Sequence, residues 1–139
     1  MYLLDTNVVS EMRRRQRMAP AVAVWAASVL PVDLYLSVLS VLELETGVLL
    51  IARRDPEQGR VLTDWIERNV LRAFDGRILP VDLSTVRRCA PMHAPNPRPA
   101  KDALIAATAL AHGMVLVTRN VRDFDGTGAT ILNPWDWTA

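Results

Sequence analysis

Four acidic residues that lie far apart in the sequence occupy comparable positions. Asp5 closes a short apolar run, and Glu43 lies in the first turn of the helix expected after the second apolar strand. Asp102 opens an apolar helix, and Asp123 follows the apolar run that ends at Thr118. In an open parallel sheet, strand ends and the following helix starts gather along one edge, so we expect the four carboxylates to converge. Such a cluster repels itself, and Mg²⁺ or Mn²⁺, rather than zinc, suits a site made of carboxylates alone.

Each acid also has a purely structural interpretation. Asp5 could cap a helix, and Glu43 could complete a capping box with Ser40. Asp102 could complement a helix dipole, and Asp123 could hold a turn. Taken together, these structural interpretations leave the shared sheet edge as a coincidence.

Other common catalytic sites are absent from the sequence. It contains no phosphate-binding glycine loop, no Gly-x-Ser-x-Gly elbow and no cysteine pair for zinc. His93 falls in a proline-rich segment, and His112 falls in the last turn of an expected helix, where a cation suits the dipole. Cys89 is interpreted as a small core residue rather than a nucleophile. The acids are therefore the main candidates for chemistry.

The elements that must position these acids alternate along the chain. Strands are expected at residues 2–4, 34–38, 78–81, 114–118 and 130–132. Helices are expected at residues 7–14, 19–29, 40–52, 56–74 and 101–112, with a further helix beginning at Ser84. The proline-rich segment 91–99 is expected to be a loop. This alternation predicts an α/β domain with a mostly parallel sheet.

Length and composition limit the class of protein. The 139 residues form one expected domain, 1–139, and 50% apolar with 22% charged residues argue against a disordered tail or a membrane protein. Asp5 interrupts the first apolar stretch, so no secretory signal is expected, and a single cysteine fits a reducing cytoplasm. The net charge of +1 is no strongly basic field. All lysine and arginine positions except Lys101 are occupied by arginine. This bias is explained either by a GC-rich genome, which favours arginine codons, or by phosphate recognition.

Gly47 lies one turn after Glu43 on the same expected helix. Glycine costs a helix about 1 kcal/mol relative to alanine. One explanation for the glycine is that another backbone or a ligand approaches closely at this position. The other is that the helix tolerates the glycine.

Four ordered segments resemble the motifs of PIN-domain ribonucleases of the VapC and FitB type. They are MYLLDTNVVSE at 1–11, ELETG at 43–47, KDALIAATA at 101–109 and VTRNVRDF at 117–124. The ending LNPW at 132–135 is also similar. The match runs through the whole chain.

This resemblance implies a three-layer α/β/α fold, a homodimer and RNA cleavage that depends on Mg²⁺ or Mn²⁺. It implies that the catalytic acids are Asp5, Glu43, Asp102 and Asp123. Asp5 and Asp102 are the implied metal ligands. Thr118 and Asn120 are implied as supporting residues, and Asn7 only weakly. Asp125 falls outside the motif and is taken as a bystander.

The leading functional hypothesis is an endoribonuclease toxin of a type II toxin–antitoxin pair, located in the cytoplasm. The resemblance points to tRNA as the substrate. It also implies an antitoxin that lays a helix into an apolar groove, for which Val22, Val24, Trp25 and Val29 are candidates unless they are buried in the domain. Arginines that could follow the RNA backbone are Arg13, Arg14, Arg15 and Arg119, although the first three could equally form a solvated helix end.

Two alternatives remain open at this point. One is a DNA-directed or housekeeping nuclease of the same fold that has no inhibitor. The other is a catalytically vestigial module that acts only in a DNA-binding regulatory complex with its antitoxin. The complete set of four acids argues against the vestigial module.

Overall fold

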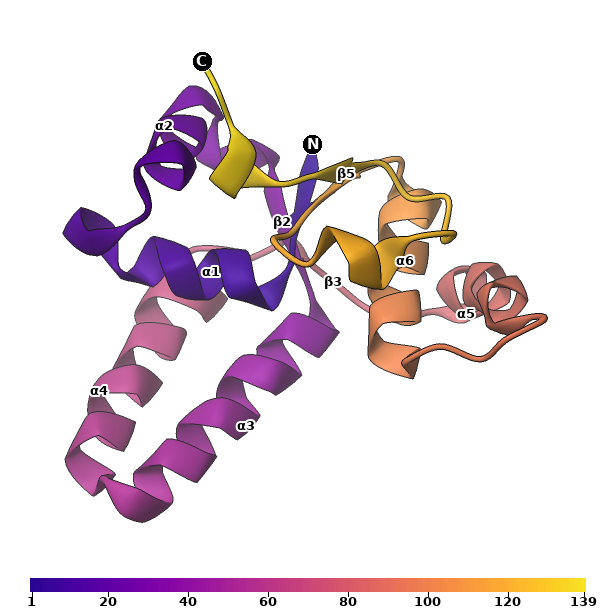
Figure 1. Cartoon of the computed structure of the whole chain (residues 1–139). Coiled ribbons are helices and arrows are strands. Elements are labelled where there is room, and N and C mark those ends of the chain that lie inside the picture. Colours follow the sequence, from indigo (N-terminus) through magenta and orange to yellow (C-terminus); the bar gives the residue numbers. More distant parts are fainter.

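The computed structural model describes residues 1–139, which form a five-stranded sheet with helices on both faces (Figure 1). The strands are β1 Tyr2–Leu4, β2 Leu34–Ser37, β3 Ile78–Leu79, β4 Val115–Val117 and β5 Ile131–Leu132. They lie in the order β3-β2-β1-β4-β5, and every neighbouring pair is parallel. The helices are α1 Thr6–Arg13, α2 Pro20–Ser28, α3 Val38–Arg54, α4 Pro56–Trp65, α5 Leu83–Cys89 and α6 Ala100–His112. None of these helices has both the length and the apolar character needed to cross a membrane.

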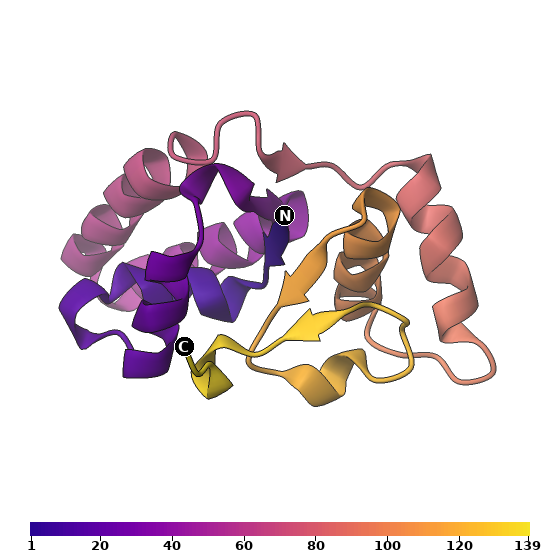
Figure 2. The ribbon, with the colours of Figure 1, turned by 90° about the horizontal axis from the view of Figure 1, so that it is seen from above.

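Side-chain alternation along the strands creates two separate cores. On β1, Leu4 belongs to the core formed with α1 to α4, and Leu3 belongs to the core formed with α5 and α6. On β4, Val117 and Leu116 divide in the same way. Successive strand residues point to opposite faces, so an apolar run must be covered on both sides. Figure 2 shows the two helical layers on either side of the sheet. The predicted three-layer α/β/α fold is confirmed.

The centre of the sheet places the ends of β1 and β4 beside each other. Leu4 is in register with Val117, and the Asp5 N–H donates to the Val117 carbonyl at 2.9 Å. Asp5 and Thr118, which follow these two strand residues, therefore meet at the carboxyl edge of the sheet. This edge is the usual place for a ligand site in an open parallel sheet.

The start of α3 differs from the prediction. The helix begins at Val38, and the Ser37 hydroxyl accepts a hydrogen bond from the Leu39 N–H at 3.0 Å. The predicted capping box of Ser40 and Glu43 is therefore wrong. Ser40 is buried inside the helix, and its hydroxyl has no hydrogen-bond partner. Ser37, the last residue of β2, caps the helix instead, because β2 stops one residue before the predicted end.

Smaller differences occur around β3. The strand ends at Leu79 because Pro80 has no N–H for the ladder. Helix α5 begins at Leu83, one residue before the prediction, because the Asp82 carboxylate accepts from the Thr85 N–H and caps it. The helix predicted over residues 56–74 is α4 followed by a wider π-helical segment, Ile66–Leu71.

The proline-rich loop 91–99 is fastened by one arginine. Its first residues complete a 3₁₀ turn, Ala90–His93. The Arg98 guanidinium donates from Nε to the Met92 carbonyl at 3.0 Å and from Nη1 to the Asp125 carbonyl at 2.8 Å. This loop leads directly into α6 and therefore sets where Asp102 begins its helix.

Candidate active site

Asp5 is the most firmly held of the four predicted acids. It is 7% exposed, and it is the N-cap of α1, with Oδ1 accepting from the Thr6 N–H at 2.8 Å. Its other oxygen, Oδ2, accepts from the Thr118 hydroxyl at 2.8 Å and from Asn7 Nδ2 at 3.3 Å. The capping interpretation is therefore correct, but Asp5 is also the centre of a polar network that capping does not require.

Thr118 is the hub of this network. Its buried hydroxyl donates to Asp5, and it accepts from Asn7 Nδ2 at 3.3 Å and from the Asn120 N–H at 3.1 Å. The Asn7 side-chain oxygen accepts from the Arg119 N–H at 3.2 Å. Asn7 therefore joins the ends of β1 and β4, a larger role than the sequence suggested for it. The contact of Asn120 with this network runs through its backbone.

Glu43 lies in the second turn of α3 and points to the same edge. Its Oε1 accepts from the Thr6 hydroxyl at 3.0 Å, and its Oε2 lies 3.4 Å from the Lys101 ammonium. Thr6 thus contacts Asp5 through its backbone and Glu43 through its side chain. The sequence predicted no role in the site for Thr6. The signal that could have found it was its position inside the Asp-Thr-Asn motif.

Asp102 and Asp123 complete the edge from the opposite helical layer. Asp102 is half-buried in the first turn of α6, and Asp123 is exposed in the 3₁₀ turn Val121–Phe124 that follows β4. The first turn of α6 has no side-chain cap, so Asp102 is favoured there by the helix dipole as well.

The charges of the four acids act on one another. Burial raises the pKa of Asp5, and the charges of Glu43 and Asp123 raise it further, whereas the bonds from Thr118 and Thr6 oppose the rise. Burial also raises the pKa of Asp102, and the charges of Asp123, Asp5 and Glu43 add to that effect. The sheet edge therefore concentrates negative charge.

The candidate ligands suit a hard cation in their chemistry, because the acids and threonines at this edge offer oxygen atoms. The raised pKa values of Asp5 and Asp102 also indicate that a positive ion would relieve their charge. No three carboxylate, histidine or cysteine side chains are grouped closely enough to hold one metal ion together. The cation that contacts the site is the Lys101 ammonium.

Two arginine side chains stack on tryptophans. Arg119 lies over Trp135 with its guanidinium carbon 5.1 Å from the ring centroid. Arg13 lies over Trp65 at 5.8 Å. Arg14, in contrast, forms an ion pair with Glu11 at 3.2 Å. The Arg119 side chain is thus held on Trp135, directly after Thr118 in the chain, whereas Arg14 stabilises the end of its own helix.

The predicted groove on α2 is not present as proposed. Val22 and Trp25 are fully buried, Val29 is half-buried against the core, and only Val24, at 46% exposed, faces outward. Burial is the correct interpretation because α2 packs its apolar side onto the sheet layer beneath it.

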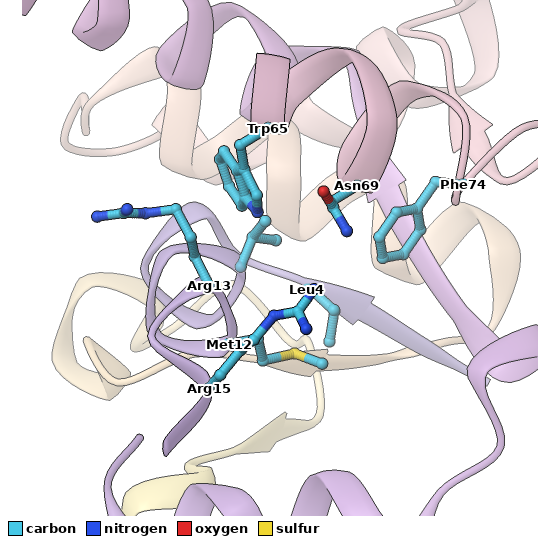
Figure 3. Close-up of a pocket in the computed structure, with 8 residues that line it drawn as sticks. Leu4, Met12, Arg13, Arg15, Trp65, Asn69 and Phe74 are labelled. Carbon is cyan, nitrogen blue, oxygen red and sulfur yellow. The ribbon is translucent and has the colours of Figure 1, made fainter. Parts of the chain in front are cut away.

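An apolar hollow instead lies between α1 and the end of α4. It has a volume of about 170 Å³ (Figure 3). It is lined by Leu4, Val9, Met12, Arg13, Arg15, Trp65, Asn69 and Phe74. In Figure 3 the Arg15 guanidinium lies beside Met12 and Leu4, facing Asn69. None of the four acids lines this hollow.

Three residues set aside or left open by the sequence can now be placed. Cys89 is buried, burial raises the pKa of its thiol, and its sulfur lies 3.6 Å from His93 Nε2. These properties fit the predicted core role. A Cβ on Gly47 would meet nothing within 4 Å, so no part of this chain requires a glycine there.

The fold and the acidic sheet edge together define a PIN domain, and the chain belongs to the PIN-domain family. The family profile matches residues 2–129. The chain is 37% identical to the VapC ribonuclease Y4jK of Sinorhizobium fredii, over 98% of this chain and 99% of that protein. It is 38% identical to the toxin FitB of Neisseria gonorrhoeae, over 97% and 99%. The solved structure of FitAB bound to a DNA fragment matches with a TM-score of 0.88 and 34% identity, covering 100% of this chain and 99% of that chain.

Proposed function

We propose that this protein is a metal-dependent endoribonuclease that acts as the toxin of a type II toxin–antitoxin pair. The observation that carries the proposal is the convergence of Asp5, Glu43, Asp102 and Asp123 at one edge, with Asp5 fixed by Thr118. The similarity to a VapC ribonuclease and to the toxin FitB supports it. Its site of action is the cytoplasm.

In this proposal Asp5 and Asp102 hold Mg²⁺ or Mn²⁺. The ion, when bound, would lower the pKa of a water molecule and neutralise charge on the phosphate during in-line attack. Thr118 and Asn7 fix the direction of the Asp5 lone pairs, so that this carboxylate needs no rearrangement. Glu43 and Asp123 complete the negative field, and Arg119 on Trp135 contacts the RNA backbone.

The proposed partners are an RNA substrate, with tRNA as the first candidate, a second copy of the chain in a homodimer, and an antitoxin protein. The FitB relative is known in a FitAB complex, which supports a protein partner. The hollow between α1 and α4 suits an apolar segment of such a partner, because five of its eight lining residues are hydrophobic.

One experiment tests the enzymatic part of this proposal. The purified chain is incubated with total RNA and with tRNA in Mg²⁺, in Mn²⁺ and in excess chelator, beside an Asp5→Asn variant. We expect cleavage only with metal and only by the unaltered protein. Full cleavage by protein shown to be free of metal would refute the metal mechanism.

A second experiment tests the toxin role. Expression of the chain alone should arrest bacterial growth, and Asp5→Asn should relieve the arrest at equal protein level. Normal growth with soluble unaltered protein would favour the alternative, a vestigial module acting in a DNA-binding complex. That alternative is kept because the FitAB relative was solved on DNA.

A further inference from the structure

Lys101 forms an unusual ion pair across the candidate site. Its ammonium lies 3.4 Å from Glu43 Oε2 and joins the first turn of α6 to α3. The other ion pairs, Arg14 with Glu11 and Arg68 with Asp64, each lie within four residues along the chain. Since α3 and α6 lie on opposite faces of the sheet, the Lys101 pair spans the acidic edge between the two helical layers.

The position of Lys101 is not explained by its own helix. It is the second residue of α6, and a cation near a helix N-terminus is opposed by the helix dipole. Its charge instead acts on the acids, because it opposes the rise in the pKa of Asp102. The charge of Lys101 therefore stabilises the carboxylate cluster and slightly destabilises α6.

The type of cation also matters. Lys101 is the only lysine in a chain that uses arginine at every other cationic position. An ammonium is a compact point charge on a flexible stem, whereas a guanidinium holds a carboxylate with a rigid two-pronged fork. A single contact at 3.4 Å on a side chain that is 46% exposed can be displaced more easily than such a fork.

We propose that Lys101 is a tethered counter-cation of the acidic site, which opposes the binding of a divalent metal ion beside Glu43 and so sets the metal affinity. Its ammonium balances the carboxylates when no metal is bound, and it leaves Glu43 when the ion binds, because the two cations repel each other. Lys101 is thus a positioning residue, and this inference rests on the metal site of the proposed function.

The test measures metal binding rather than cleavage. The Kd for Mn²⁺ is determined by calorimetry for the full chain and for Lys101→Met, Lys101→Arg and Arg60→Met. Arg60 is an exposed arginine on α4, next to Gly59, which packs on Ala52. Ala52 lies nine residues beyond Glu43 on α3, roughly 14 Å along the helix. Arg60→Met therefore removes the same charge away from the site.

We expect Lys101→Met to bind Mn²⁺ about threefold to tenfold more tightly, whereas Arg60→Met stays within about twofold of the unaltered chain. Lys101→Arg should bind Mn²⁺ more weakly than the unaltered chain, because its two-pronged fork is harder to displace from Glu43. In chelator, Lys101→Met should also melt below Arg60→Met, because the acids lose their counter-charge. Unchanged or weaker Mn²⁺ binding by folded Lys101→Met would overturn the inference. Lys101→Gln replaces the methionine variant if that protein does not fold.

The outcomes separate this inference from the proposed function. Tighter Mn²⁺ binding by Lys101→Met in a protein that cleaves no RNA would support the counter-cation and refute the ribonuclease. Metal-dependent cleavage with unchanged Mn²⁺ affinity in Lys101→Met would support the ribonuclease and refute the counter-cation. If neither protein binds Mn²⁺, the metal site itself is wrong and both fail.

Discussion

Replacing Thr118 with valine isolates the hydrogen bond that fixes Asp5. The two side chains have nearly the same shape, so Thr118→Val leaves no large cavity and removes only the buried hydroxyl. The main loss is the 2.8 Å bond to the largely buried Asp5 carboxylate. A hydrogen bond to a charged group contributes about 1.5–3 kcal/mol. The two donors that lose an acceptor are Asn7 Nδ2 and the Asn120 N–H; Asn7 is half-buried and Asn120 is exposed, so water can replace the lost acceptor.

We therefore expect Thr118→Val to lower the free energy of unfolding by about 2–3 kcal/mol near pH 7 in chelator. For a chain of this length that is a fall in Tm of roughly 7–10 °C. Thr108→Val is the matched control, because Thr108 is equally buried but donates to the Leu104 carbonyl of its own helix at 2.7 Å. That carbonyl is neutral, so the control should lose about 1 kcal/mol or less.

The pH dependence makes the test specific for Asp5. The pKa of Asp5 in the folded protein is raised above 3.8, so ionisation of Asp5 lowers stability as pH rises through that pKa. The Thr118 bond lowers this pKa and limits the loss, so its removal should matter most when Asp5 is charged. The difference between Thr118→Val and the unaltered chain should shrink as pH falls below the Asp5 pKa. Urea unfolding at several pH values measures it.

Two results would refute this reasoning. One is a loss of stability in Thr118→Val that is equal at acidic and neutral pH. The other is a loss no greater than that of Thr108→Val. Either would mean that the Asp5 carboxylate gains no net stabilisation from the hydroxyl, and that the network does not fix it.

Three further changes test the site and its scaffold. Asp102→Asn should abolish cleavage yet melt no lower than the unaltered chain in chelator near neutral pH, because it removes a charge that burial and the neighbouring acids disfavour. If melting and cleavage assays show an active but destabilised variant, Asp102 serves only its helix. Gly59→Ala should lower the free energy of unfolding in urea by about 1–3 kcal/mol, because its Cβ would lie 2.5 Å from the Ala52 Cβ. The Cβ of Gly47→Ala would meet nothing within 4 Å, so this change should raise the free energy of unfolding by about 0.5–1 kcal/mol. Equal effects would contradict the packing of α3 on α4. Arg119→Met should weaken RNA binding and reduce its salt dependence by about one phosphate contact in a titration of Kd against salt, and an unchanged salt slope would remove Arg119 from the RNA path.

The buried helix and the strands were predictable because their patterns have one simple cause. Residues 101–112 are apolar nearly all round, and α6 is indeed buried on most sides and ends at Gly113, which adopts a left-handed conformation with φ of 64°. The acids could be placed at one edge because parallel strands end together. These predictions used only the period of the pattern and the direction of the chain.

The contacts inside the site could not be predicted in the same way. Which of Ser37 and Ser40 caps α3 depends on where β2 stops pairing, which is set by its neighbours in the sheet. The link from Thr6 to Glu43 and the pair of Glu43 with Lys101 join residues brought together only by the packing of separate helices. The apolar side of α2 gave no sign of whether the domain itself or a partner covers it.

The bond between Asp5 and Thr118 joins residues 113 positions apart in the chain. Contacts of such long range form late, because the chain loses much loop entropy before it gains them. During synthesis β1 emerges first, but its central partner β4 follows more than a hundred residues later, and Asp123 later still. An unfinished chain therefore holds Asp5 without the hydroxyl that fixes it and without the last acid. The acidic site of a growing copy on the ribosome is consequently incomplete until nearly the whole length of the chain has been made.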